Sequence, residues 1–282
     1  MIGDKNEIQA GDNSTNIQGN KVTVMNNGLG YPEVRQVVMD VFKSNFYDLG
    51  EKVERLVNER AEEIINKYLK RLEEQYPKLI NNTEDPDMRF AIYEVQKSYA
   101  RLGDKEISDL LVEVLIQRTK NQGESFKKLV LNEALTIIPK LTSKQIDVLS
   151  LIYLVKYLAF IPEFKIPFEQ YNSLIQPFLT TIEIPINEMF YQHLQYSGCV
   201  SISIGSSTFH TVMVNKFPHL FANNDNLMTV LNAHPYLTHV KNVWDSSKLC
   251  NCSLSSVGIA IALSNIKMKM SHEWDLGLWI NE

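Results

Sequence analysis

The sequence has little cysteine and no long uninterrupted apolar run. Three cysteines among 282 residues exclude a disulfide-stabilised scaffold and fit a reducing compartment. The first residues contain no apolar stretch of signal-peptide length. The most apolar run, residues 146–161, is shorter than a membrane span and is interrupted by Asp147 and Lys156. We therefore expect a cytoplasmic protein without a transmembrane segment.

The sequence also lacks the common motifs of catalysis and phosphate binding. It contains neither a Gly-x-Ser-x-Gly nucleophile elbow nor a Walker-type loop. Residues 205–208 begin like an elbow, but Phe209 stands where the second glycine belongs. The net charge of −5 gives no general attraction to nucleic acid. A non-enzymatic protein without a cofactor is the prediction, and nucleic acid is not the expected partner.

The first thirty residues form a polar repeat. The dipeptide Ile-Gln at residues 8–9 returns at residues 17–18, and Gly-Asp at residues 3–4 returns at residues 11–12. Short Ile-Gln or Val-Thr-Val strands alternate with Gly, Asp, Asn and Ser corners, and Gly and Asn accept the backbone angles of tight turns. A few such strands leave unpaired edges that favour pairing with another copy, and Asn and Gln side chains can stack in ladders. The predicted assembly residues are Ile8, Gln9, Gly11, Asn13, Ile17, Gln18 and Asn20.

Residues 8–13 of this repeat, Ile-Gln-Ala-Gly-Asp-Asn, resemble the Ile/Val-Gln-x-Gly-x-Asn core of amyloid-type signalling motifs. Such motifs link receptors to cell-death effectors in bacterial, fungal and animal immunity. The resemblance implies recruitment or self-assembly through this segment. The motif lies at the N-terminus here, whereas many bacterial effectors carry it at the other end. Two other interpretations stay open, namely a polar tail and a small β-cap that joins two or three subunits.

Residues 31–161 show the apolar spacing of a helical bundle. Apolar residues recur at intervals of three and four from Val34 to Leu72, with a possible break at Gly50. Asp85 and Asp104 are predicted N-caps, Gly103 ends the helix between them, and residues 142–145 form a capping box. The fourth helix is expected over 124–138 and the fifth, an apolar core helix, over 144–161. We predict an antiparallel packing of these helices.

The end of the chain has a different composition. Prolines mark residues 162–185 as a linker, and all cysteines and histidines lie after it, within residues 186–282. Residues 187–196 are predicted to form a helix, 199–204 a short strand, and a further helix start or turn follows near Gly258. Segment 209–217, capped by Ser206 or Ser207, fits either a helix or a strand. The last residues, 274–280, are interpreted as a strand whose tryptophans pack inside.

The fold class predicted is mainly α: a helical bundle, a short N-terminal β-forming repeat and a small α+β C-terminal domain. Leu194-x3-Gly198 and Leu254-x3-Gly258 resemble turns of winged-helix folds. The same region is similar to the C-terminal portions of bacterial abortive-infection-type helical proteins, which implies a role in anti-phage defence. Ordinary glycine-terminated helices remain an alternative for both patterns.

Three weaker sites complete the sequence-based candidates. His234, His239, Cys250 and Cys252 are ligand types that zinc accepts, although one residue between the two cysteines is a poor chelating spacing. Cys199 with a histidine would suit a hydrolase. Lys267 and Lys269 form a basic spot too small to indicate nucleic-acid binding.

The function predicted is self-assembly through the repeat, with the protein acting as an effector or adaptor of bacterial defence. The expected partners are further copies of the chain and a defence protein, and a membrane only after activation. A nucleic-acid-linked regulator and a Cys/His-dependent hydrolase are the alternatives.

Overall fold

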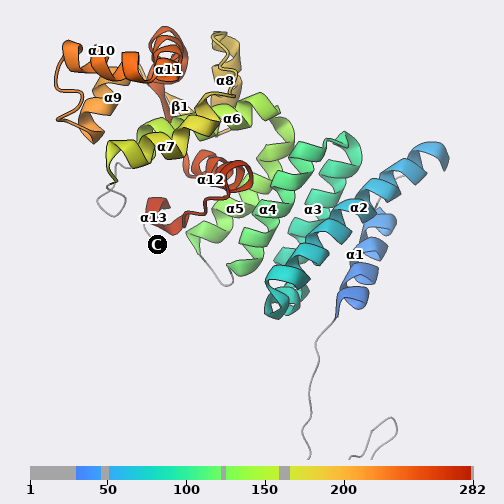
Figure 1. Cartoon of the computed structure of the whole chain (residues 1–282). Coiled ribbons are helices and arrows are strands. Elements are labelled where there is room, and N and C mark those ends of the chain that lie inside the picture. The colour runs from blue at the N-terminus through green and yellow to red at the C-terminus, as the bar shows by residue number, and fades with distance from the viewer. Residues whose placement is uncertain (1–29, 46–50, 122–124, 159–165, 281–282) are drawn as a thin grey trace, which may run out of the picture.

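A computed structural model describes residues 30–45, 51–121, 125–158 and 166–280 (Figure 1). Its first part contains seven consecutive helical elements. They are α1 (Tyr31–Asn45), α2 (Glu51–Gln75), the 3₁₀ helix η1 (Pro77–Glu84), α3 (Pro86–Leu102), α4 (Lys105–Lys120), α5 (Phe126–Ile137) and the 3₁₀ helix η2 (Ile138–Lys140). The predicted mainly α fold is confirmed, and the predicted repeat of residues 1–30 lies almost entirely outside the described residues.

The first helices pack in chain order, each against its neighbours. Helix α2 packs against α1 and α3, and α4 packs against α3 and α5, as Figure 1 shows for the blue-to-green helices. The predicted caps between them are confirmed. Asp85 accepts a hydrogen bond from the backbone N–H of Met88 at 3.0 Å, and Asp104 accepts one from Ile107 at 3.0 Å. Gly103 takes the left-handed φ of 69° that ends α3.

The apolar helix predicted over residues 144–161 is present but changes its geometry. Helix α6 (Ser143–Ile152) begins with the predicted capping box of Thr142 and Gln145. It continues as a π-helical turn, η3 (Tyr153–Tyr157), and residues 159–161 lie outside the described part of the chain. The apolar side chains of this helix are buried, as expected for a core helix. Among the described residues no helix combines the length and the apolarity that crossing a membrane requires.

The remaining elements follow residue 165. They are α7 (Phe168–Leu179), α8 (Glu188–Tyr196), β1 (Val200–Ile202), α9 (Phe209–Lys216), α10 (Asn224–Ala233), α11 (Pro235–Ser246), the 3₁₀ helix η5 (Lys248–Asn251), β2 (Cys252–Leu254), α12 (Ser256–Met270) and α13 (Gly277–Ile280). Strands β1 and β2 pair antiparallel, with Val200 opposite Leu254. In the described residues this pair is the whole β content of the predicted α+β end.

Two local predictions for this region were wrong. The last residues form helix α13 instead of a strand, although Trp274 and Trp279 do pack, both against the ring of Tyr153. Of the two alternatives for segment 209–217 the helix is correct, since α9 spans Phe209–Lys216, but Thr208 caps it instead of Ser206 or Ser207. Thr208 is one residue closer to the helix, and its hydroxyl accepts the N–H of Thr211 at 3.2 Å.

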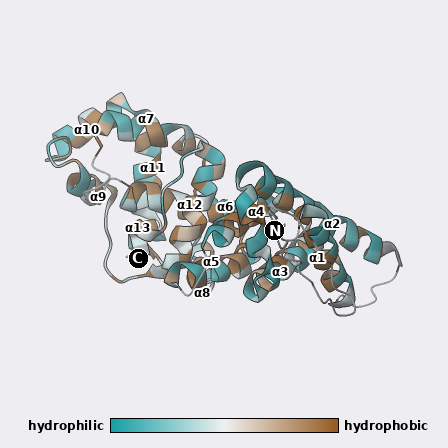
Figure 2. Cartoon of the chain, turned by 90° about the horizontal axis from the view of Figure 1, so that it is seen from below, coloured by the Kyte–Doolittle hydropathy of each residue, from teal (hydrophilic) through white to brown (hydrophobic). Residues whose placement is uncertain are grey.

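Helix α12 lies in the middle of the molecule and joins its two ends. It packs against α4, α5 and α6, although about a hundred residues separate it from them in sequence. Ten consecutive residues of α12, Val257–Ile266, are buried, whereas Figure 2 shows many hydrophilic residues along outer helices such as α2 and α7. The main buried core runs from Val34 to Leu276 as one cluster. Residues 186–282 therefore share their core with the bundle of residues 31–161.

A close backbone contact sets the start of α12. Ser255 donates from its backbone N–H to the carbonyl of Cys199 at 3.0 Å, and its hydroxyl accepts the N–H of Gly258 at 3.0 Å. A side chain on Gly258 would collide with the same Cys199 carbonyl oxygen. The two Leu-x3-Gly patterns of the sequence therefore meet here, because Gly198 precedes Cys199 and closes α8 at a φ of 75°.

Candidate functional site

The sequence-predicted sites fall in very different places. All seven predicted assembly residues, from Ile8 to Asn20, lie outside the described residues. The metal candidates are spread over three elements. His234 precedes α11, His239 lies within it, Cys250 is in η5 and Cys252 is buried in β2. Across the part of the chain that the structure describes, no three His, Cys, Asp or Glu side chains are grouped closely enough to hold a metal ion.

The thiol of Cys199 is poorly placed for nucleophilic chemistry. It is completely buried, and its Sγ lies 3.9 Å from the carbonyl oxygen of Ser197. Burial raises the pKa of Cys199 to about 12, and burial likewise raises the pKa of Cys252 to about 11. Both thiols stay protonated near neutral pH, whereas the nucleophile of a cysteine hydrolase is the thiolate.

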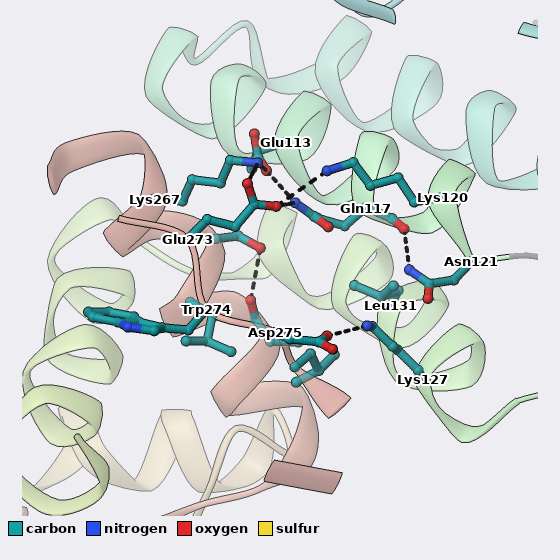
Figure 3. A pocket seen from close by; sticks show the side chains of 14 residues that line it. Glu113, Gln117, Lys120, Asn121, Lys127, Leu131, Lys267, Glu273, Trp274 and Asp275 are labelled. Carbon is teal, nitrogen blue, oxygen red and sulfur yellow. Dashed lines mark hydrogen bonds and ion pairs between the residues drawn. The ribbon is translucent and has the colours of Figure 1, made fainter. Parts of the chain in front are cut away.

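A cavity of about 410 Å³ with a charged lining is the strongest candidate site. It lies between α4, α5, α12 and the segment that follows α12 (Figure 3). This volume falls in the range of small-molecule sites. We call it the lysine pocket, and its lining residues are Glu113, Gln117, Lys120, Asn121, Lys127, Leu131, Ala260, Leu263, Ser264, Lys267, Glu273, Trp274, Asp275 and Leu276.

Glu113 supplies the innermost charge of the lysine pocket. Its side chain has no solvent exposure and lies in the middle of α4. Lys267 of α12 places its Nζ 2.9 Å from Oε1 of Glu113. The other carboxylate oxygen pairs with Arg71 of α2, and Gln117 donates to Oε1 at 2.9 Å. Three helices thus converge on one buried carboxylate, which satisfies the demand that a buried charge be paired.

Glu273 connects the segment after α12 to the cations of the pocket. Its Oε2 lies 3.0 Å from Nζ of Lys267, and its Oε1 lies 3.3 Å from Nζ of Lys120. Gln117 also donates to Oε1 at 3.0 Å. Burial alone would raise the pKa of Glu273, but the contacts from Gln117 and Lys267 and the charge of Lys120 outweigh it and lower the pKa to about 2. Glu273 is therefore ionised at neutral pH.

Asp275 forms the outer part of the same network. It pairs with Lys127 of α5, and the hydrogen bond from Lys127 lowers the pKa of Asp275. Between the two acidic residues, Trp274 lines one side of the pocket, as Figure 3 shows. Its ring also packs on that of Tyr153, at a centroid distance of 5.9 Å. The segment following α12 thus presents two carboxylates and one indole to the pocket.

A second cavity, of about 530 Å³, adjoins the lysine pocket on the other side of Glu273. The two share Lys267 and Glu273, and the second also involves Arg71 and Asp109. Lys67 pairs with Asp109 at its edge. Glu273 and Lys267 therefore line both spaces.

The lysine pocket was not among the predicted sites, although the sequence contains one signal for it. Glu113 is the only charge in the apolar run from Leu110 to Ile116, and a charge on the buried face of a helix requires a partner. The basic spot of Lys267 and Lys269 turns out to be two separate ion pairs. Lys267 faces the pocket, whereas Lys269 pairs with Asp147 of α6 at 2.6 Å. The partners come from distant parts of the chain, which spacing along one helix does not reveal.

The arrangement of the lysine pocket suits binding better than proton transfer. The carboxylates of Glu273 and Asp275 both face ammonium groups, which keeps them ionised and poor as general acids at neutral pH. The amides of Gln117 and Asn121 add neutral hydrogen-bonding groups, and Leu131 and Leu276 add apolar surface. Charged groups, amides and apolar side chains in one concave space are typical of a site for a small polar ligand.

Comparison with known proteins places the chain in one family. The chain belongs to the family whose model, described as ":-like", matches residues 28–229 and 222–280. No curated protein and no solved structure matches the chain.

Proposed function

We propose that the protein is a non-enzymatic, self-assembling protein of bacterial anti-phage defence. In this proposal copies of the chain associate through the N-terminal repeat, and the helical body acts as the effector or adaptor that the assembly displays. The resemblance of residues 8–13 to amyloid-type signalling motifs supports the first part. The similarity of the C-terminal region to abortive-infection-type proteins supports the link to defence.

One observation carries the proposal: a polar repeat precedes a helical body that has its own buried core. The helical body has its own buried core, which begins at Val34 and extends to Leu276. A polar, repetitive segment of about thirty residues precedes that core, at the length of a few short strands. A segment of this kind with unpaired strand edges is suited to pairing with further copies of itself.

Two features of the body favour binding over catalysis and over membrane insertion. The thiols of Cys199 and Cys252 are buried and have raised pKa values, which leaves them protonated near neutral pH. The apolar side chains of α6, the segment predicted to reach a membrane after activation, are part of the core and pack against α12. Exposing them would require the body to unfold. An adaptor or scaffold role therefore agrees better with the body than a membrane-disrupting one.

The solution mass of the protein tests the assembly proposal. We expect the full chain to sediment as an oligomer or fibre and a chain beginning at Tyr31 to sediment as a monomer. In the full chain, Ile8→Ser with Ile17→Ser should have the same effect as the deletion, because polar serine weakens strand pairing and packing between sheets.

The matched control is the double variant Ile186→Ser and Ile204→Ser, which makes the same chemical change at two exposed isoleucines of the body. This control should leave the oligomer unchanged. The same association state for the full chain and the shortened chain would refute the proposal. If only the control variant lost the oligomer, the association surface would lie on the body and not in the repeat.

A further inference from the structure

The lysine pocket carries an excess of positive charge on its walls and only negative charge on the segment that covers it. The walls are formed by α2, α4, α5 and α12. Counting both cavities, they contribute four cationic and two acidic side chains, an excess of positive charge. The segment after α12 adds the two carboxylates that balance it. The cationic side chains are Arg71, Lys120, Lys127 and Lys267, and the acidic ones are Asp109 and Glu113.

The two kinds of charge differ in their exposure to solvent. The lysine side chains are 16% to 23% exposed, whereas those of Glu273 and Asp275 are 49% and 62% exposed. Lys120 is further held by the ring of Tyr76, 4.1 Å from its Nζ. The ammonium groups are therefore fixed parts of the wall. The carboxylates are groups at the rim that can turn into water at small cost, since exposed ion pairs contribute little free energy.

The backbone of the covering segment is held independently of these ion pairs. Leu276 is buried, and the ring of Trp279 packs on Tyr153 at 5.2 Å and on Tyr157 at 5.9 Å. Together with the end of α12 at Met270, these contacts fix both ends of a short bridge. Glu273 and Asp275 can therefore leave the lysines by side-chain rotation, while the bridge remains attached to the core.

We propose that the lysine pocket binds a small molecule carrying two or more phosphate groups, and that Glu273 and Asp275 occupy the positions of those groups in its absence. Lys120 and Lys267 already hold the two oxygens of one carboxylate, and Lys127 holds a second carboxylate. Phosphate oxygens would accept hydrogen bonds from the same ammonium groups, and a phosphate group carries more negative charge than a carboxylate. The Gln117 N–H that Glu273 would release, together with the lining side chains of Asn121 and Leu131, would face the rest of the ligand. This inference concerns the body alone and does not depend on assembly through the repeat.

The proposal makes Glu273 and Asp275 internal competitors of the ligand. Replacing both with amides, Glu273→Gln and Asp275→Asn, keeps their shape and removes the two negative charges. We expect the affinity for inorganic pyrophosphate, measured by titration calorimetry on the full chain, to rise about tenfold or more in this variant. Replacing Lys120 and Lys127 with glutamine should lower the affinity of the double-amide variant by a similar factor.

Two controls separate a site from general electrostatic attraction. Glu183→Gln removes a carboxylate that pairs with Lys144 on another surface of the molecule, so it changes the net charge without touching the pocket. It should leave pyrophosphate binding unchanged. The conservative pair Lys120→Arg and Lys127→Arg should retain most of the binding that the glutamine pair loses. A melting curve for each variant identifies any that fails to fold, and the arginine pair keeps the test valid in that case.

Comparison of pyrophosphate with adenosine triphosphate distinguishes two sources of the ligand. Tighter binding of the nucleotide would indicate an organic phosphate whose body contacts the pocket wall, and equal binding would indicate an inorganic polyphosphate. The proposal is overturned if the double-amide variant binds neither probe more tightly than the wild type. It is also overturned if Glu183→Gln raises the affinity as much as the amides in the pocket do.

Discussion

Two ionic clusters in this molecule each pair a buried charged side chain, but with partners from different parts of the chain. In the first, Arg118 of α4 is 1% exposed and pairs with Asp87 of α3. Its Nε donates to Asn132 of α5 at 2.8 Å, its Nη1 donates to the carbonyl of Asn121 at 2.9 Å, and Lys128 lies 3.1 Å from Asp87. All partners come from three consecutive helices. The cluster is complete within the bundle.

The second cluster surrounds Glu113, which lies five residues before Arg118 on the same helix. Here the buried group is an anion, and its partners come from α2 and α12. The outer ions belong to the segment after α12, and cavities lie on both sides of Glu273. One helix therefore carries a closed cluster that joins neighbouring helices and an open one that ends in space for a ligand. A buried charge alone, such as Arg118, does not indicate a ligand-binding site. Glu113 is a better indication, because cavities adjoin it and the outermost ion-pair partners there are exposed to solvent.

The largest expected effect tests the closed cluster. Arg118→Ala removes the cation that holds α3, α4 and α5 together and leaves Asn132 and the carbonyl of Asn121 without its hydrogen bonds, at about 1–3 kcal/mol for each buried group left unpaired, or about 2–6 kcal/mol in all. Urea unfolding should show a decrease of that size in the free energy of unfolding. Pyrophosphate binding by the folded variant should change far less than in the Lys120 and Lys127 variants, because Arg118 does not line the lysine pocket and contacts it only through the carbonyl of Asn121.

The control for this prediction is Arg101→Ala, at an exposed position in the last turn of α3. Its effect on stability should stay within about 0.5 kcal/mol, as for most surface substitutions. A loss below about 1 kcal/mol for Arg118→Ala would contradict the view that the closed cluster is structural.

A second prediction concerns the helix that supplies Lys267 to the open cluster. Gly258→Ala places a methyl group against the Cys199 carbonyl oxygen and should lower the free energy of unfolding by about 1–3 kcal/mol, the usual cost of overpacking. Thermal unfolding followed by circular dichroism measures it. Gly205→Ala is the control, since a methyl group there meets nothing within 4 Å. Equal melting temperatures for the two variants would show that α12 can shift to make room.

The smallest expected effect concerns the pH dependence of the open cluster. The pKa of Glu273 is lowered from 4.5 to about 2, so its ion pairs stabilise the folded state above pH 4.5 and that contribution is lost as the pH falls toward 2. Because its side chain is half exposed, the contribution is at most about 1 kcal/mol. Glu273→Gln should therefore lower stability slightly at pH 6 and have no effect at pH 2.

Urea midpoints between pH 6 and pH 2 provide the measurement for this prediction. Asp87 of the closed cluster also has a pKa lowered to about 2, since its contacts with Arg118, Lys128 and Asn132 outweigh burial. The titration of Asp87 affects the wild type and the Glu273→Gln variant equally, so it cancels in the difference between them. If Glu273→Gln changed stability equally at both ends of the pH range, the ion pairs of Glu273 would not be its cause.

Much of the helical part could be predicted from sequence because its signals are local. The cap of Asp85, the capping box of Thr142 and the stop at Gly103 each depend on a few adjacent residues, and all were confirmed. The last residues were misassigned as a strand because alternating apolar residues over a short segment suit either structure. Contacts of the tryptophans with Tyr153 in a distant helix favour the helix there, and no local pattern contains that information.

The candidate site could not be predicted because its residues are brought together by long-range packing. Lys267 and Glu113 are separated by 154 positions in sequence and meet only because α12 lies between α4, α5 and α6. Lys267 and Lys269 are two residues apart and were predicted to form one basic spot, but side chains at this spacing on a helix point in different directions. The predicted zinc ligands failed for the same reason. His234, His239, Cys250 and Cys252 are close in sequence, but the fold places them on separate elements.

The central position of α12 also determines when a newly made chain can complete its structure. Helices α4, α5 and α6 leave the ribosome more than a hundred residues before the helix that covers them. Until residues 256–270 have been synthesised, the apolar faces of these helices have no native cover, and such faces bind chaperones or aggregate. A premature stop before or within residues 256–270 would therefore yield a chain with an open core, so a folded body requires translation through the end of α12.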